Sequence, residues 1–248
     1  MILNKTYNEN CLDTMARMSD NLIDLTITSP PYDNLRTYNG YSFDFESIAK
    51  ELYRVTKDGG VVVWIVGDAT IKGSETGTSF KQALFFKECG FNLHDTMIWH
   101  KPNAMPQVDK TRFTQSFEYM FILSKGKPKT ANPLKTATKN GGKFLSRGDG
   151  NSESINKKGG NIVSKERISF NVYNLFVGSK NNGHPAIFPE KLANDHIISW
   201  SNENDLVYDP FMGSGTTAKM AILNNRKHIG SEISKEYCNI ITQRINLD

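Results

Sequence analysis

The sequence predicts an α/β protein: one domain with a mostly parallel, seven-stranded sheet, helices on both of its faces and one inserted basic region. Strand-like and helix-like segments alternate along residues 1–100, and the same alternation returns in residues 184–248. Between these parts, Gly, Ser, Asn and Lys are frequent and apolar residues show no regular spacing. Alternation of strands and helices is typical of parallel sheets, and 248 residues are enough for one domain with a well-buried core.

The first predicted strand is Ile23–Thr28, which is rich in β-branched residues. A helix is predicted at Phe45–Val55 because its apolar residues recur at helical spacing. The continuous apolar run Val61–Val66 is typical of a strand that is covered on both faces. The elements predicted next are a helix at Phe80–Cys89, which Gly90 closes, and strands at Leu93–Trp99 and Tyr119–Leu123.

The elements predicted in the C-terminal part are a helix at Glu190–Trp200, a strand at Leu206–Tyr208, a helix at Ala218–Leu223 and a strand at Lys227–Ser231. The intervening segment contains glycine pairs at 141–142 and 159–160, which interrupt any periodic pattern. We therefore expect residues 1–124 and 184–248 to be two halves of one domain, and residues 125–183 to be an insertion.

Positive charge is concentrated in this insertion. The whole chain has a net charge of only +4, yet Lys125 to Arg167 contain eleven Lys and Arg against three acids. Such a segment is the electrostatic footprint expected of a protein that binds a phosphate backbone. A solvated, flexible basic loop fits the charge pattern equally well.

Composition argues against several other classes of protein. The three cysteines, Cys11, Cys89 and Cys238, are far apart and form no CxxC pair, and the five histidines show no ligand spacing, so we expect no metal site and no disulfide. The apolar segments are too short to span a bilayer, and the N-terminus lacks the layout of a signal peptide. The cytoplasm is the expected location.

A glycine-rich loop, DPFMGSGTT at residues 209–217, lies between a predicted strand and a predicted helix. It is not a Walker A loop, and Ala218 stands where GxGxxG would have its third glycine. The next strand ends at Glu232, where an acid can accept hydrogen bonds from both ribose hydroxyls of an adenosine. A nucleoside cofactor without a pyrophosphate fits this pattern, although the glycines alone also fit an ordinary tight turn.

The strand at Ile23–Thr28 runs into the corner Ser29-Pro30-Pro31-Tyr32. Proline has a fixed φ, so the carbonyl directions in this corner are rigidly set, and the Ser29 hydroxyl is a further acceptor. Acceptors on the hydrogens of an exocyclic amino group favour attack by its nitrogen, and Tyr32 offers a face on which an extruded base can stack. Taken alone, the corner also fits an ordinary strand-terminating turn.

Together these motifs resemble those of the S-adenosylmethionine-dependent DNA amino-methyltransferases, which act on cytosine N4 or adenine N6. The segment from His184 to Pro189 is similar to the HPxxFP segment of that family, and the order of the motifs resembles its permuted β-class. The resemblance implies a Rossmann-like methyltransferase domain with S-adenosyl-L-methionine as cofactor. It implies that the catalytic residues are Ser29, Pro30, Pro31 and Tyr32, and that the cofactor-binding residues are Asn10, Pro185, Phe188, Asp209, Phe211, Gly213, Ser214, Gly215, Thr216 and Glu232.

The role of Asn10 is implied by position, because Asn10 stands where family members often have an Asp before a Cys. Its amide oxygen can accept a hydrogen bond from the adenine amino group.

A duplex base must be extruded to reach such a corner, so the basic insertion is the candidate for target recognition. The residues expected to bind DNA are Arg36, Lys143, Arg147, Lys157, Lys158, Lys165 and Arg167. The expected partner is double-stranded DNA, with no membrane. The resemblance is compatible with a second copy of the chain and with a cognate restriction enzyme as further partners, and the sequence leaves both open. The expected source is a bacterium, an archaeon or a phage.

Three functions fit the motifs. The first is a site-specific DNA amino-methyltransferase, the second is an RNA or protein N-methyltransferase of similar fold, and the third is a non-catalytic DNA-binding module. The basic insertion and the motif order favour the first over the second, and the intact glycine loop with Glu232 argues against the third. In the resembled family, Ser-Pro-Pro-Tyr tends to accompany cytosine N4 methylation and Asp- or Asn-Pro-Pro-Tyr adenine N6 methylation, so Ser29 makes cytosine N4 the predicted target and adenine N6 the alternative.

Overall fold

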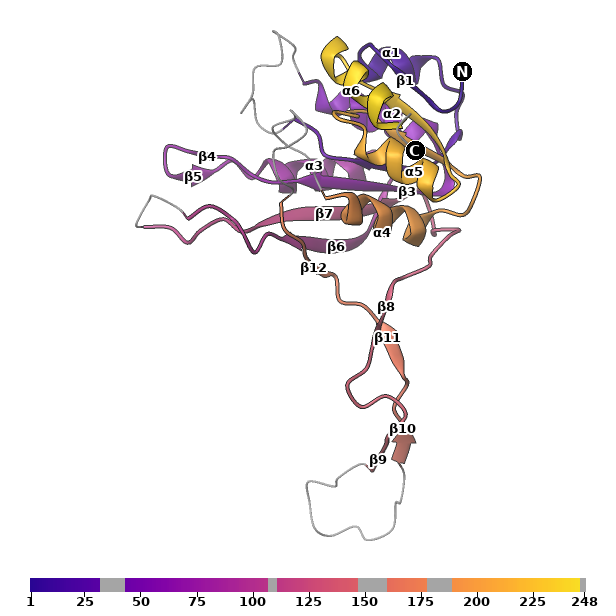
Figure 1. Cartoon of the computed structure of the whole chain (residues 1–248). Coiled ribbons are helices and arrows are strands. Elements are labelled where there is room, and N and C mark those ends of the chain that lie inside the picture. The colour runs from indigo at the N-terminus through magenta and orange to yellow at the C-terminus, as the bar shows by residue number, and fades with distance from the viewer. Residues whose placement is uncertain (32–42, 107–110, 147–159, 178–188, 246–248) are drawn as a thin grey trace. The chain divides into compact units, whose positions relative to one another are not determined.

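The computed structural model describes residues 1–31, 43–106, 111–146, 160–177 and 189–245. The described residues form two compact units (Figure 1), one made of Met1–Asn132 with Asn171–Asp248 and the other of Pro133–Phe170. The sequence predicted an insertion at residues 125–183, and the separate unit is narrower than that range.

The first unit is built on a sheet of eight strands in the described part of the chain. In spatial order these are β1 (Lys5–Tyr7), β14 (Lys227–Ser231), β13 (Leu206–Asp209), β2 (Ile23–Thr28), β3 (Thr56–Val66), β7 (Phe117–Ser124), β6 (Asn92–His100) and β12 (Val172–Asn174). Only β7 runs antiparallel to its neighbours, and the other pairs are parallel. The prediction of a mostly parallel sheet is confirmed, whereas the predicted count of seven strands is wrong.

The additional edge strand β12 lies inside the range predicted as insertion. Its residues pair with the end of β6, with Val172 opposite Ile98 and Asn174 opposite His100. The indole N–H of Trp99 also donates to the carbonyl oxygen of Leu175 at 2.9 Å. A three-residue strand has too few positions to show an alternating pattern, so the pairing with β6 is what identifies it.

Helices cover both faces of this sheet (Figure 1). The helices are α1 (Cys11–Ala16), α2 (Phe45–Val55), α3 (Thr78–Glu88), α4 (Glu190–Trp200), α5 (Thr216–Leu223) and α6 (Lys235–Ile245). One core cluster joins α1, α2 and α3 to Trp64 of β3, and a second joins α4 and α5 to Ile65 of the same strand. Successive side chains of β3 thus enter opposite cores, which explains why Val61–Val66 is continuously apolar.

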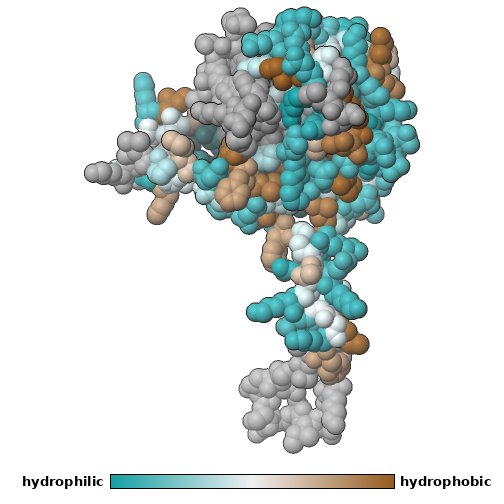
Figure 2. Space-filling view, viewed as in Figure 1, coloured by the Kyte–Doolittle hydropathy of each residue, from teal (hydrophilic) through white to brown (hydrophobic). Residues whose placement is uncertain are grey.

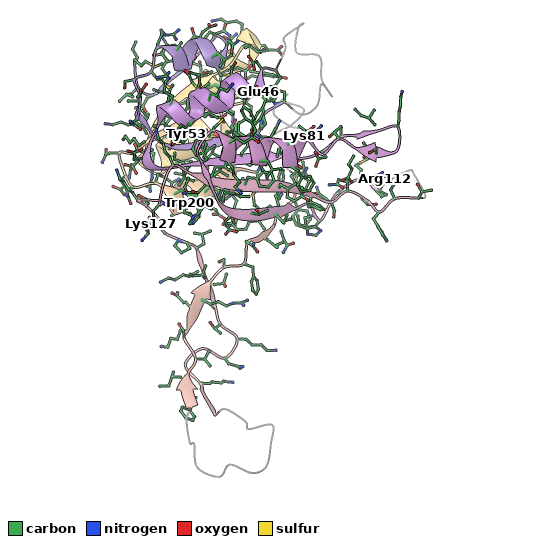
Figure 3. All side chains as sticks on the ribbon, turned by 180° about the vertical axis from the view of Figure 1, so that it is seen from behind. Glu46, Tyr53, Lys81, Arg112, Lys127 and Trp200 are labelled. Atoms are coloured by element: carbon green, nitrogen blue, oxygen red, sulfur yellow. The ribbon has the colours of Figure 1, made fainter. Side chains whose placement is uncertain are left out.

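A small hairpin, β4 (Thr70–Ile71) with β5 (Ser74–Glu75), follows the carboxyl end of β3. Arg112, from the connection between β6 and β7, holds this hairpin (Figure 3): its guanidinium donates to the carbonyl oxygen of Gly73 at 2.7 Å and to Oε1 of Glu75 at 3.1 Å.

The second unit consists of two antiparallel ladders, β8 (Lys135–Ala137) with β11 (Glu166–Ile168) and β9 (Phe144–Ser146) with β10 (Gly160–Ile162). None of its described side chains is fully buried, and polar side chains predominate along it (Figure 2). A two-stranded ribbon without a core is marginally stable in water.

Candidate active site

The Ser29–Pro31 corner, the glycine loop, Glu232 and Asn10 come together at the carboxyl ends of neighbouring strands. Strands β1, β14, β13 and β2 are parallel neighbours, so their carboxyl ends lie side by side. Asn10, Glu232, Asp209 and Ser29 come at or shortly after these four ends. In open parallel sheets, ligands bind at the carboxyl ends of the strands.

The predicted catalytic corner follows β2 directly. Pro30 is buried, whereas Ser29 and Pro31 are half-buried. The preceding residue, Thr28, is fully buried, and its hydroxyl donates to Oδ1 of Asp209 at 2.7 Å. The corner is therefore anchored to the neighbouring strand β13 at the point where the glycine loop begins.

The glycine loop is a tight turn between β13 and α5. Gly213 and Gly215 have φ values of 54° and 86°, in the left-handed region that favours glycine. A Cβ at position 215 would lie 3.0 Å from Cγ1 of Ile241, so a larger residue there would press against α6. The turn places backbone N–H groups and the positive end of α5 at the loop, where a ligand can approach closely.

Glu232 is held against this loop from the end of β14. Its Oε2 accepts a hydrogen bond from the N–H of Gly213, and its Oε1 accepts one from the N–H of Ser234, both at 2.8 Å. The side chain is buried, and burial raises the pKa of its carboxyl. Each carboxylate oxygen has a further lone pair, so the group can accept hydrogen bonds from two ribose hydroxyls.

Two asparagines lie at the end of β1. Asn10 caps α1, since its Oδ1 accepts a hydrogen bond from the N–H of Leu12 at 2.9 Å. Asn8 donates from Nδ2 to the carbonyl oxygens of Glu232 and Ile233 at 2.9 and 3.0 Å. Asn8 thereby ties the end of β1 to the end of β14, and the predicted contact of Asn10 with adenine stays a prediction.

Asp209 is almost completely enclosed by the protein. It is 1% exposed, and burial raises the pKa of its carboxyl to about 6. Three groups donate to the carboxylate in the described part of the chain: the hydroxyls of Thr28 and Thr217, each at 2.7 Å, and the N–H of Phe211 at 3.0 Å. These contacts join β2, the glycine loop and α5 through one side chain.

Phe211, another predicted cofactor residue, is half-buried beside the same loop. Its ring centroid lies 5.7 Å from that of Phe43 and 6.4 Å from that of Trp64. These edge-to-face contacts fix one side of the ring within the first core cluster.

Arg244 of α6 donates hydrogen bonds to the glycine loop. No feature of the sequence predicts this role. One guanidinium nitrogen donates to the carbonyl oxygen of Ser214 at 2.7 Å and to its Oγ at 2.8 Å, and it lies 3.4 Å from Oγ1 of Thr216. The other terminal nitrogen donates to Oε1 of Glu190 at 2.8 Å. Ser214 and Thr216, predicted to bind the cofactor, are thus buried against Arg244.

Three of the residues predicted to bind DNA, Lys143, Lys165 and Arg167, lie exposed in the second unit. The guanidinium of Arg167 stacks 4.0 Å from the ring centroid of Phe170. The other predicted site residues lie outside the described part of the chain: Tyr32, Arg36, Arg147, Lys157, Lys158, Pro185 and Phe188.

No group of three or more His, Cys, Asp or Glu side chains in the described ranges is arranged to hold a metal ion. In the same ranges, no helix combines the length and the apolar character needed to cross a membrane.

Solved structures of similar fold include a PvuII DNA methyltransferase described as cytosine-N4-specific. That structure has a TM-score of 0.73 and 24% identity, and the match covers 98% of this chain and 86% of that one. An M1.HpyAVI structure described as an S-adenosylmethionine complex has a TM-score of 0.64 and 23% identity, covering 98% and 99% of the two chains. At these identities the likeness concerns the fold.

Sequence relatives are more informative about the family. The orphan methyltransferase M.BamHII of Bacillus amyloliquefaciens is 59% identical over 92% of this chain and 90% of its own length. The type II methyltransferase M.BglII of Bacillus subtilis is 28% identical over 97% of this chain and 68% of its own length. The model of the N6_N4_Mtase family, described as DNA methylase, matches residues 23–243. This chain therefore belongs to the N6/N4 family of DNA methylases.

Proposed function

We propose that this protein transfers the methyl group of S-adenosylmethionine to the N4 amino group of a cytosine in double-stranded DNA. The observation that carries the proposal is the hydrogen bond between Thr28 and Asp209, residues 181 positions apart. The corner follows β2 and the glycine loop follows β13, which are adjacent parallel strands, and this hydrogen bond joins their carboxyl ends. A methyl donor held by the loop and a base held by the corner would then be neighbours.

The loop and Glu232 fit the nucleoside part of this cofactor. The buried carboxylate of Glu232 is an acceptor for ribose hydroxyls. Gly213 has no Cβ, so a ligand can approach its backbone closely. The relatives of similar fold that were solved with S-adenosylmethionine support the same choice of cofactor.

The catalytic corner fits the chemistry of the acceptor. When bound, S-adenosylmethionine supplies an electrophilic methyl group. The lone pair of an exocyclic amino group is delocalised into the base, so it needs acceptors on its hydrogens to become nucleophilic. The Ser29 hydroxyl and the rigid carbonyls of Pro30 and Pro31 are such acceptors. The in-line geometry depends on how firmly the corner is anchored to the sheet.

Ser29 is the basis for preferring cytosine. A serine hydroxyl carries no full charge and reaches less far than an aspartate, which is the stronger acceptor for the amino group of adenine. The cytosine-N4-specific description of one solved structure agrees with this preference. Adenine N6 is the second candidate, because the family includes methylases of both bases.

The test is methylation of a mixed-sequence duplex with labelled S-adenosylmethionine, followed by digestion to nucleosides. We expect N4-methylcytosine and no product with the Ser29→Ala variant, which should still bind the cofactor. N6-methyladenine alone would move the target to adenine. Label in RNA or protein but not in DNA would contradict the proposal as a whole.

The exposed basic residues of the second unit, Lys143, Lys165 and Arg167, are proposed to contact DNA phosphates. A homodimer and a cognate restriction enzyme are proposed on the resemblance alone. A cytoplasmic location is proposed because a bacterial DNA methyltransferase is a relative of this chain. Sedimentation equilibrium of the free protein and of its DNA complex tests the homodimer. A mass of one chain would contradict it.

A further inference from the structure

Thr28 is the last residue of the strand that carries the catalytic corner. It is fully buried, and its hydroxyl donates to Oδ1 of Asp209 at 2.7 Å. Strands β2 and β13 are parallel here, with Val207 opposite Leu25 and Tyr208 opposite Thr26. The hydrogen bond between the two side chains therefore joins β2 to β13 beyond their last paired residues. At this point the Ser29–Pro31 corner and the glycine loop begin.

Asp209 also connects β2 to the glycine loop and to α5. Its Oδ2 accepts a hydrogen bond from the hydroxyl of Thr217 in the first turn of α5 at 2.7 Å. Its Oδ1 also accepts one from the N–H of Phe211 at 3.0 Å, inside the glycine loop. The carboxylate thus touches the catalytic strand, the loop and the helix that follows the loop.

These contacts occupy the carboxylate with donors from inside the protein. Asp209 is 1% exposed, so little of it can reach a ligand. A buried carboxyl group is costly unless it is hydrogen-bonded, and a hydrophobic residue at this position would pack without that cost. The presence of a carboxylate at position 209 is explained if its hydrogen bonds connect the Ser29–Pro31 corner to the glycine loop.

We propose that Thr28, Asp209 and Thr217 form a hydrogen-bonded bridge that sets the distance and orientation between the Ser29–Pro31 corner and the glycine loop. In this proposal, which rests on the proposed function, Thr28 and Asp209 are positioning residues for methyl transfer. The bridge acts through Ser29 and the loop, and it touches neither substrate. Methyl transfer requires the reacting atoms to be aligned, and a displacement of about 1 Å costs on the order of 100-fold in rate.

The experiment compares Thr28→Val, Thr28→Ser and Thr26→Val. Valine has the shape of threonine without the hydroxyl, and serine keeps the hydroxyl. Thr26 is a matched control, because it lies two residues earlier on the same strand, is fully buried, and its hydroxyl has no hydrogen-bond partner in the described part of the chain. For each protein, turnover and KM with duplex DNA are measured, together with cofactor affinity by calorimetry and thermal unfolding.

We expect Thr28→Val to lower kcat by about 10- to 100-fold, with cofactor affinity within about twofold of the unmodified protein. Thr28→Ser should recover most of the rate, and Thr26→Val should behave like the unmodified protein. A Thr28→Val enzyme as fast as Thr26→Val would overturn the bridge. If Thr28→Val does not fold, Thr217→Val tests the other arm, and an unchanged kcat there overturns the proposal equally.

Failure of the bridge and failure of the function are distinguishable. An unmodified protein that transfers no label to DNA contradicts the proposed function. An active unmodified protein whose Thr28→Val and Thr28→Ser variants lose rate equally contradicts the bridge alone, because the hydroxyl would then not be the group that matters.

Discussion

The carboxylate of Glu232 and the backbone N–H of Gly213 are joined by a hydrogen bond of 2.8 Å. This bond holds the acid at the end of β14 against the turn that opens the glycine loop. The proposed ribose acceptor and the proposed cofactor cradle are therefore one connected structure.

A first prediction concerns the pH dependence of cofactor binding. Burial raises the pKa of Glu232 above its ordinary value of 4.5. Ribose hydroxyls donate to the ionised carboxylate, so S-adenosylmethionine affinity should be full above the raised pKa and should fall as the pH drops through it. The fall should begin at a higher pH than for an ordinary glutamate. Calorimetry across this range checks it, and Glu232→Gln should bind about 10- to 100-fold more weakly at pH 7 without that pH dependence.

A second prediction concerns the turn of the loop. Gly215→Ala adds a Cβ 3.0 Å from Ile241 at a φ of 86°, and the φ alone costs about 1–2 kcal/mol for a residue with a side chain. Both the free energy of unfolding and the cofactor affinity should fall. Gly126→Ala is the control, because its φ is 73° and nothing lies within 4 Å of the added Cβ. Equal cofactor affinity of the two variants would contradict a role of the turn in binding.

A third prediction separates the two contacts of Arg244. Its guanidinium donates to Ser214 from a largely buried position, and hydrogen bonds of charged groups contribute about 1.5–3 kcal/mol. Arg244→Ala should lower the free energy of unfolding by about that amount and weaken cofactor binding. Glu190→Gln removes the half-exposed charge that pairs with Arg244 and, at 3.5 Å, with Lys219, and about 0–1 kcal/mol is expected for each of these ion pairs. Denaturant titration of both variants checks this, and a larger loss for Glu190→Gln would reverse the assignment.

A fourth prediction concerns the basic residues of the second unit. Lys165→Gln and Arg167→Gln should weaken duplex binding, and each lost phosphate contact should reduce the slope of log affinity against log salt by roughly one. Cofactor affinity should not change. Lys50→Gln on α2 removes the same charge from an exposed helix position and should leave the slope unchanged. If all three variants shift the slope equally, net charge and not a DNA contact is responsible.

Much of the first unit could be predicted from the sequence. Helices α2 and α4 begin and end at the predicted residues, because long amphipathic patterns with clear ends depend mainly on local sequence. The three-residue strands β1 and β12 were not predicted, since each is defined by pairing with a strand far away in the chain.

The sequence by itself determined the residue types on which the proposed chemistry of the site rests. The corner at Ser29, the loop from Asp209 and the acid at Glu232 are local motifs, and their residue types already indicate an amino-methyltransferase. Only the tertiary structure decided how these motifs are held. The bridge from Thr28 to Asp209 and the support of the loop by Arg244 join residues 181 and 30 positions apart. Such contacts arise from the order of strands in the sheet and the packing of α6, for which no short stretch of sequence carries a signal.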